Sequence, residues 1–190
     1  MKTVQIRSNP NILLDSARLV LRRIEEEDQK LLERLFCDAE MMRYLGGTWS
    51  LDQVIETLHE WHNEWGINHY WYGVLVRKDT AEAIGIAGFT TNTNPGEPGL
   101  EFSWFIVPEQ QKRGYATEIT QGILEFAFEH LNIDRAFAET HPENVASNRV
   151  LEKLGFVNMG ERHHKYDYLP GFEEQVLWEY MRSNWISKDS

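Results

Sequence analysis

The sequence predicts a single mixed α/β domain in which a central sheet is flanked by helices. Its 190 residues, 42% of them hydrophobic, are enough for one well-buried core and short for two. No repeat, low-complexity linker or long Pro/Gly/Ser run marks a boundary, so we expect residues 1–190 to form one domain. The expected elements run as a strand, helices, three consecutive strands, and then alternating strands and helices, an order typical of mixed α/β folds.

The first half of the chain is expected to contain one strand and three helices. Asp38 is a plausible N-cap for the second helix. Ser50 and Gln53 have the spacing of a capping box, and the apolar residues that follow them fall at helical spacing until Gly66 closes the third helix. The expected elements are a strand at 18–24 and helices at 27–36, 38–45 and 50–66.

The second half is expected to alternate strands with helices after a three-stranded meander. Apolar residues at Ala116, Ile119, Ile123 and Ala127 recur at three- and four-residue spacing, which predicts an amphipathic helix. A type II turn at 169–172 should join the last two strands as a hairpin. The expected strands are 71–77, 83–90, 100–107, 135–140, 156–168 and 175–182, and the expected helices are 115–130 and 144–154.

The turn between the third meander strand and the following helix is the most informative stretch. Pro108 removes the donor that a continuing strand would need, so the strand stops there. The helix N-terminus beyond it leaves up to four N–H groups unpaired and carries the positive end of the macrodipole. Lys112 and Arg113 add charge, Gly114 lets the backbone bend and approach a ligand, and Ala116 keeps the first turn small. The turn is therefore predicted to hold phosphate.

The spacing Gln111-x-x-Gly114-x-Ala116 resembles the acetyl-CoA signature of the GNAT superfamily of N-acetyltransferases, Gln/Arg-x-x-Gly-x-Gly/Ala. Alone, so short a pattern could also be a tight turn with no ligand. Twenty-eight residues beyond Ala116, however, Asn144 opens a stretch ending in Leu-Gly-Phe at 154–156 that is similar to the second GNAT motif. Within the superfamily, two stretches most resemble the ribosomal-protein N-terminal alanine and serine acetyltransferases. These stretches are Tyr115-Ala116-Thr117-Glu118 and Asn144-x-x-Ser147-x-x-Val150-Leu151-Glu152-Lys153.

This resemblance implies a twisted, mostly antiparallel sheet whose two middle strands, 100–107 and 135–140, splay apart to admit the pantetheine arm of acetyl-CoA. It implies no metal. The backbone of Phe105, Ile106 and Val107 would hydrogen-bond that arm. The other cofactor contacts that the resemblance implies come from Gln111, Lys112, Arg113, Gly114, Tyr115, Ala116, Thr117, Asn144 and Ser147.

Glu101 is the candidate catalytic base, acting directly or through a water. Acetyl transfer to an amine needs a neutral amine, a stabilised oxyanion and a proton for the departing thiolate, and it requires no covalent enzyme intermediate. An unpaired carboxylate one residue into an apolar strand is costly unless it faces a polar cleft. The alternative is a Glu exposed at the start of the strand. The resemblance favours the first interpretation, because related enzymes often place a carboxylate on this strand.

Ser147 is the candidate catalytic acid for the thiolate. Its alternative role, like that of Asn144, is helix capping and local backbone bonding. Many GNAT enzymes have a proton-donating tyrosine four residues before the glycine of the second motif, but this chain has Leu151 there. That departure supports the ribosomal-protein-type subfamily, which has a serine where this chain has Ser147.

Composition limits the partners. Nineteen basic against 30 acidic residues give a formal charge of −11, which argues against nucleic acid and would steer in a cationic substrate, although it could serve solubility alone. No stretch approaches the roughly 20 apolar residues of a membrane helix, and residues 1–10 lack the apolar region of a signal peptide. Cys37 is the sole cysteine, so no internal disulfide can form. We expect a cytoplasmic protein, and a homodimer through the final strands is an open alternative.

The acceptor is the open question. A primary amine at a protein N-terminus fits the resemblance best, while the alternatives are a small-amine acetyltransferase for a polyamine, amino sugar or antibiotic, and a non-catalytic acyl-CoA sensor. Trp49 and its neighbours could shape the acceptor site. His59, His62 and His69 lie in an aromatic segment, where we expect core packing by Trp61 and Trp65 rather than a metal site.

Overall fold

Eight strands form one sheet in the part of the chain that the computed structural model describes, which is residues 10–65, 67, 70–92, 98–163 and 174–186. Their order across the sheet is β1-β2-β3-β4-β5-β6-β8-β7, and among these neighbours β5 and β6 alone run parallel. The strands are β1 (Ile12–Asp15), β2 (Leu19–Arg22), β3 (Tyr70–Arg77), β4 (Ala83–Asn92), β5 (Gly99–Ile106), β6 (Arg135–Thr140), β7 (Val157–His163) and β8 (Glu174–Met181). The helices are α1 (Gln29–Phe36), α2 (Leu51–Glu64), α3 (Tyr115–His130), α4 (Val145–Leu154) and α5 (Arg182–Ile186), with short 3-10 turns η1 (Glu26–Asp28) and η2 (Pro108–Gln110).

Helices α1 and α2 cover one face of the sheet. Phe36 of α1 packs edge-on against Phe105 of β5, with ring centroids 5.0 Å apart, and Trp61 of α2 stacks on Tyr72 of β3 at 5.1 Å. Because alternate residues of a strand share a face, Glu101 and Ser103 lie on the same side of β5 as Phe105. This side is called the α1/α2 face below.

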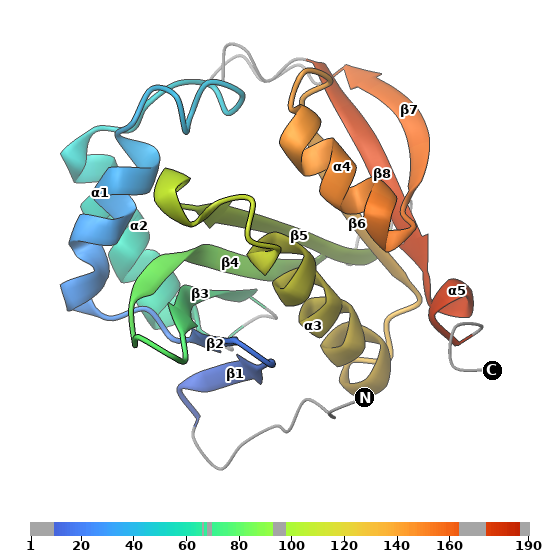
Figure 1. The fold of residues 1–190 in the computed structure, drawn as a ribbon, viewed down its shortest axis with the longest axis horizontal. Helices are drawn as coiled ribbons and strands as arrows, with labels where there is room; N and C mark the ends of the chain where they lie inside the picture. The colour runs from blue at the N-terminus through green and yellow to red at the C-terminus, as the bar shows by residue number, and fades with distance from the viewer. Residues whose placement is uncertain (1–9, 66, 68–69, 93–97, 164–173, 187–190) are drawn as a thin grey trace.

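Helices α3 and α4 lie on the opposite face, in front of the sheet in the view of Figure 1. Phe126 of α3 packs on Phe89 of β4 at 5.9 Å. Phe156, which follows α4, packs on Phe102 of β5 at 5.5 Å. The long, fully buried apolar row of α3 explains why this helix matches its predicted bounds: burial of an apolar stripe, rather than propensity, supplies most of the stability of such a helix.

Strands β5 and β6 diverge after a short parallel ladder (Figure 1). Their pairing in the described residues consists of Leu100 with Ala136 and Glu101 with Phe137. Beyond that point β5 remains paired to β4, while β6 remains paired to β8. The predicted splay of the two middle strands is thus confirmed, and α3 and α4 both begin near its open end.

The segment 38–45, predicted to be a short helix, forms turns instead. Asp38 does act as a local cap, because its Oδ1 accepts from the Met41 N–H at 2.9 Å, and one helical bond follows from the Met42 N–H to the Asp38 carbonyl at 3.0 Å. The next bond, from the Leu45 N–H to the Met42 carbonyl, spans three residues instead of four, as in a 3-10 turn. One turn fixes several dihedral angles for a single hydrogen bond, so a helix this short does not sustain itself.

Other expected elements are largely confirmed. The capping box of α2 is present, with reciprocal Ser50 and Gln53 bonds of 2.8 and 3.2 Å, and β7 and β8 form the predicted antiparallel pair. Strand β1 and helix α5 were not predicted. Gly66, the turn at 169–172 and the end of the strand predicted at 156–168 lie outside the described residues. In the described ranges, no helix combines the length and apolarity needed to cross a membrane.

Candidate functional site

The loop from β5 to α3 is bent by two residues with positive φ. Gly114, at φ +82°, is the N-cap of α3, and Lys112 adopts φ +59°. A non-glycine residue in this region is uncommon and indicates a backbone held in place by its surroundings. The shape of the loop is therefore set by its contacts with the rest of the chain.

The first turn of α3 presents backbone N–H groups without helical acceptors. The first helical bond runs from the Glu118 N–H to the Gly114 carbonyl at 3.0 Å, so the amides of Tyr115, Ala116 and Thr117 precede the helical ladder. Gly114 makes no side-chain cap hydrogen bond to them. Together with the positive end of the helix dipole, these amides form a place where an anion binds favourably.

Gln111 holds the loop against the end of β5. Its side-chain Nε2 donates to the Ile106 carbonyl at 2.8 Å, so this motif residue has a structural contact of its own. The Val107 N–H donates to the Ile84 carbonyl at 3.0 Å, on the β4 side. Because neighbouring residues of a strand direct their backbone groups to opposite sides, the Ile106 N–H points toward the diverging side. Of the three backbone positions expected to bind the pantetheine arm, Ile106 therefore offers its amide, and Val107 does not.

Arg18 fastens the other side of the loop. Its NH1 donates to the Arg113 carbonyl at 3.0 Å, and its guanidinium lies 4.7 Å from the centre of the Tyr115 ring. Glu118 accepts from the Ser16 hydroxyl at 2.7 Å and from the backbone N–H and Nε of Arg18 at 2.7 and 2.6 Å. Burial acts to raise the pKa of Glu118, but these bonds outweigh it and leave the pKa below its ordinary value. Sequence reasoning missed both Arg18 and Glu118, since their pairing is long-range.

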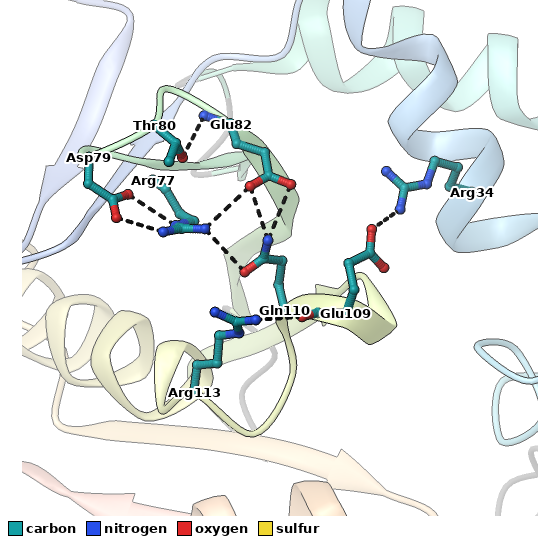
Figure 2. Close-up of polar contacts among 8 residues, drawn as sticks. All are labelled: Arg34, Arg77, Asp79, Thr80, Glu82, Glu109, Gln110 and Arg113. Carbon is teal, nitrogen blue, oxygen red and sulfur yellow. Dashed lines mark hydrogen bonds and ion pairs between the residues drawn. The ribbon is translucent and has the colours of Figure 1, made fainter.

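Glu109 ties the loop to α1 (Figure 2). Its carboxylate pairs with Arg34, and its carbonyl accepts from Arg113 at 3.3 Å. Its own backbone N–H, followed by the Arg34 guanidinium, lowers the pKa of this carboxyl. Both side chains of the ion pair are about half exposed, so the pair orders the loop more than it stabilises the fold.

The second motif forms the N-terminus of α4. Asn144 is its N-cap, and its Oδ1 accepts from the Ser147 N–H at 3.2 Å, as the alternative capping role predicted. Asn148 is anchored more deeply: the Thr140 hydroxyl donates to its Oδ1 at 2.5 Å, and Trp178 in turn donates to that hydroxyl at 2.9 Å. This buried chain of bonds fixes the start of α4 against β6 and β8, with Ser147 half-buried in its first turn.

Glu101 is exposed on the α1/α2 face, beside its strand partner Phe137 where the parallel ladder ends. On the same face the hydroxyls of Tyr72 and Ser103 lie 3.0 Å apart. Burial, opposed by the bond to Ser103 and aided by the charge of Glu101, raises the pKa of Tyr72 to about 12. Tyr72 thus stays protonated near neutral pH, where it can donate a hydrogen bond but cannot serve as a base.

Glu101 and Ser147 are not brought into contact. Glu101 lies on the α1/α2 face at the base of the splay, whereas Ser147 belongs to α4 on the opposite face, beyond the far end of β6. From Phe137 to the last β6 residue alone the strand advances roughly 10 Å. The two candidate catalytic residues would therefore meet their reactants from opposite faces of the sheet.

The segment between α1 and α2 contacts the start of the second motif across the open end of the splay. Tyr44, from the segment between α1 and α2, stacks on His141 with ring centroids 4.9 Å apart and donates from its hydroxyl to the Glu143 carbonyl at 3.0 Å. Trp49 of the same segment stacks on Phe36 at 4.3 Å. The segment expected to line the acceptor site is thus joined to the start of the second motif.

The histidine-rich segment shows structural contacts. His62 lies with Nδ1 2.8 Å from the Ile24 carbonyl, its own carbonyl accepts from Arg23, and Trp61 is buried in the core. His69 lies outside the described residues. Within the ranges that can be examined, no three His, Cys, Asp or Glu side chains gather as metal ligands.

Fold and sequence comparisons together identify the chain as an N-acetyltransferase. It belongs to the GNAT family, because the acetyltransferase (GNAT) domain matches residues 18–157, which confirms the resemblance inferred from the two motifs. The chain is 31% identical over 158 residues to the uncharacterized N-acetyltransferase YoaA of Bacillus subtilis (strain 168), across 78% of this chain and 84% of that protein.

Solved structures of similar fold include two acetyltransferases with different acceptors in their names. One is the ribosomal-protein-S5-alanine acetyltransferase from Vibrio fischeri, with a TM-score of 0.72, 21% identity, and coverage of 90% of this chain and 97% of that one. The other is the spermidine N-acetyltransferase from Vibrio cholerae in complex with CoA and spermine, with a TM-score of 0.72, 22% identity, and coverage of 90% and 99%. At these identities the likeness shows the fold and leaves the acceptor undecided.

Proposed function

We propose that this enzyme transfers an acetyl group from acetyl-CoA to the N-terminal α-amine of a protein. The observation that carries the cofactor part is the start of α3, where unpaired amides follow a glycine N-cap beside two diverging strands. The acceptor part is supported by Tyr115-Ala116-Thr117-Glu118 and Ser147, which resemble the ribosomal-protein-type subfamily.

The residues of this loop fit the phosphates of CoA. The amides of Tyr115, Ala116 and Thr117 would hold the pyrophosphate, with Lys112 and Arg113 supplying positive charge. The Ile106 N–H would bind the pantetheine arm along the unpaired side of β5, and Asn144 would contact it from the start of α4. Once bound, acetyl-CoA supplies a thioester carbonyl that an amine can attack.

Glu101 would remove the proton of the amine from the α1/α2 face, directly or through a water. An α-amino group has a pKa of about 8 against about 10.4 for lysine, so the first demands less of its base. Ser147 would donate a proton to the departing thiolate of CoA from the opposite face. In this arrangement the acceptor and the cofactor approach through opposite sides of the splay and meet between β5 and β6.

A small cationic amine is the second candidate acceptor. Curated relatives include the spermidine N(1)-acetyltransferase of Vibrio cholerae, 24% identical over 76% of this chain. The formal charge of −11 also suits a polyamine. Neither observation separates it from a basic protein N-terminus.

A thiol-release assay with acetyl-CoA tests the proposal directly. The acceptors are peptides beginning with Ala, Ser or Thr, the same peptides with a blocked α-amine and a free lysine, and spermidine. We expect turnover on the free α-amine and none on the blocked peptides. Turnover on spermidine alone would show that the acceptor is a small amine and not a protein N-terminus. Calorimetric titration of the protein with CoA tests the cofactor independently of any acceptor.

A further inference from the structure

Gln110 connects the loop between β5 and α3 to the turn between β3 and β4. It lies in η2, next to the motif residue Gln111, and is only 7% exposed. Its Nε2 donates to both carboxylate oxygens of Glu82, at 3.2 and 3.0 Å, and its Oε1 lies 3.5 Å from NH1 of Arg77 (Figure 2). A buried amide is costly unless its hydrogen-bonding groups are satisfied, and here both ends are used.

The partner of Gln110 is itself held rigidly. Arg77 bonds Asp79 through Nε at 3.0 Å and NH2 at 2.6 Å, and its NH1 reaches Glu82 at 3.4 Å. The Glu82 N–H lies 3.4 Å from the Thr80 hydroxyl, which closes the β3–β4 turn. Figure 2 shows Arg77 between the two carboxylates, with Gln110 reaching up from η2. The anchor is therefore itself tied to the β3–β4 turn by several hydrogen bonds.

The negative charge of Glu82 cannot itself favour the binding of phosphate at the neighbouring loop. Glu82 would repel a phosphate group, and Arg77 compensates that charge. The chain nevertheless keeps Glu82 here, with both its oxygens turned to the Gln110 amide. Its contribution is thus the position of η2, because Gln110 lies in the same loop as Lys112 and Gly114, the two residues with positive φ.

We propose that Gln110 and Glu82 are positioning residues, which hold the loop in the conformation that presents its amides to the pyrophosphate of CoA. This inference rests on the proposed use of acetyl-CoA and adds a requirement to it. Glu109, Gln111 and Arg18 also hold the loop, so loss of the Gln110 anchor loosens it at one point and leaves the other contacts in place. The consequence is weaker CoA binding with chemistry unchanged once CoA is bound.

The test compares Gln110→Met with Gln121→Met. Methionine matches glutamine in size, and Gln121 is exposed on α3, where the same change touches nothing in the loop. We expect Gln110→Met to raise the calorimetric Kd for CoA about tenfold, to raise KM for acetyl-CoA in proportion, and to leave kcat within about twofold. Hydrogen exchange of the 109–118 amides in the ligand-free variant should be faster, while Gln121→Met should match the wild type in every measurement.

A charge-conserving swap separates positioning from charge. Gln110→Glu alone places two carboxylates together and should weaken CoA binding, whereas Gln110→Glu combined with Glu82→Gln restores an amide–carboxylate pair at the same net charge. We expect the double variant to recover wild-type Kd within about threefold. An unchanged Kd and exchange rate in Gln110→Met, or a double variant as weak as the single one, would overturn the inference alone. A wild-type protein that does not bind CoA would overturn the proposed function as well.

Discussion

Arg18 and Glu118 lie one hundred residues apart in the chain and form a two-point contact, in which the Arg18 backbone N–H and Nε donate to different oxygens of one carboxylate. Ser16 adds a third donor to the same group. The contact fastens the first turn of α3 to the β1–β2 turn. It places a structural carboxylate directly behind the amides that are proposed to bind phosphate.

Glu118→Gln should destabilise the protein by roughly 1–2 kcal/mol near neutral pH, a figure already reduced for the exposure of Arg18. The pKa of Glu118 is lowered in the folded state, so its contribution is complete above the unfolded pKa and is lost as the pH falls through the folded value. Urea unfolding across this range should show the variant and the wild type converging in acid. A constant difference at every pH would contradict this account of Glu118.

Gly114→Ala should weaken CoA binding because of backbone conformation. A Cβ at this position would meet the Arg18 NH2 at 3.5 Å, an ordinary contact, so the cost of about 1–2 kcal/mol comes from φ +82°. We expect a Kd for CoA raised about five- to tenfold. The matched control is Gly122→Ala in the same helix, where the nearest atom is 3.7 Å away and φ is helical, so stability should be unchanged or slightly higher. Equal effects of the two changes would refute the assignment.

Tyr72→Phe should alter stability in alkaline solution. The folded pKa of Tyr72 is raised from 10.0 to about 12, so the unfolded chain ionises first. Stability from this group is complete below the unfolded pKa and is lost as the pH rises through the folded value. The wild type should therefore lose stability over this interval more steeply than Tyr72→Phe, as followed by chemical unfolding. Ultraviolet titration should also show one late-ionising tyrosine that disappears in the variant.

Glu101→Gln should lower kcat about a hundredfold or more if Glu101 is the base, because a positioned general base contributes about 10²–10⁴-fold. Glu129→Gln, an exposed carboxylate near the end of α3, is the control and should retain full activity. Retention of wild-type kcat by Glu101→Gln would support the exposed-strand-start interpretation instead.

Local patterns predicted most of the fold. The spacing of Ile119, Ile123 and Ala127 located α3, and the Ser50–Gln53 box located the start of α2, because both signals depend on residues within a few positions of each other. The short segments 12–15 and 38–45 were missed or misassigned. In both, the deciding contacts come from elsewhere: β1 exists by pairing with β2, and the Met42 side chain is buried in the core while its backbone forms turns.

The candidate site was predicted in part. The motif spacing identified Gln111, Gly114 and Asn144, and the structure places the first two in the loop that opens α3 and the third at the start of α4. It also assigns Gln111 to the Ile106 carbonyl, a contact that the motif did not predict, and Asn144 to the α4 cap, which the capping alternative did predict.

The sequence by itself determined the family, the order of the elements and the glycine turn that opens α3, since each follows from residues close together in the chain. Tertiary structure alone decided what holds that turn, because Arg18 and Glu82 reach it from separate parts of the chain. Hydrogen bonds between distant residues leave no periodic signal. The packing of α1 and α2 on one face of the sheet and of α3 and α4 on the other likewise decided the sides on which Glu101 and Ser147 lie.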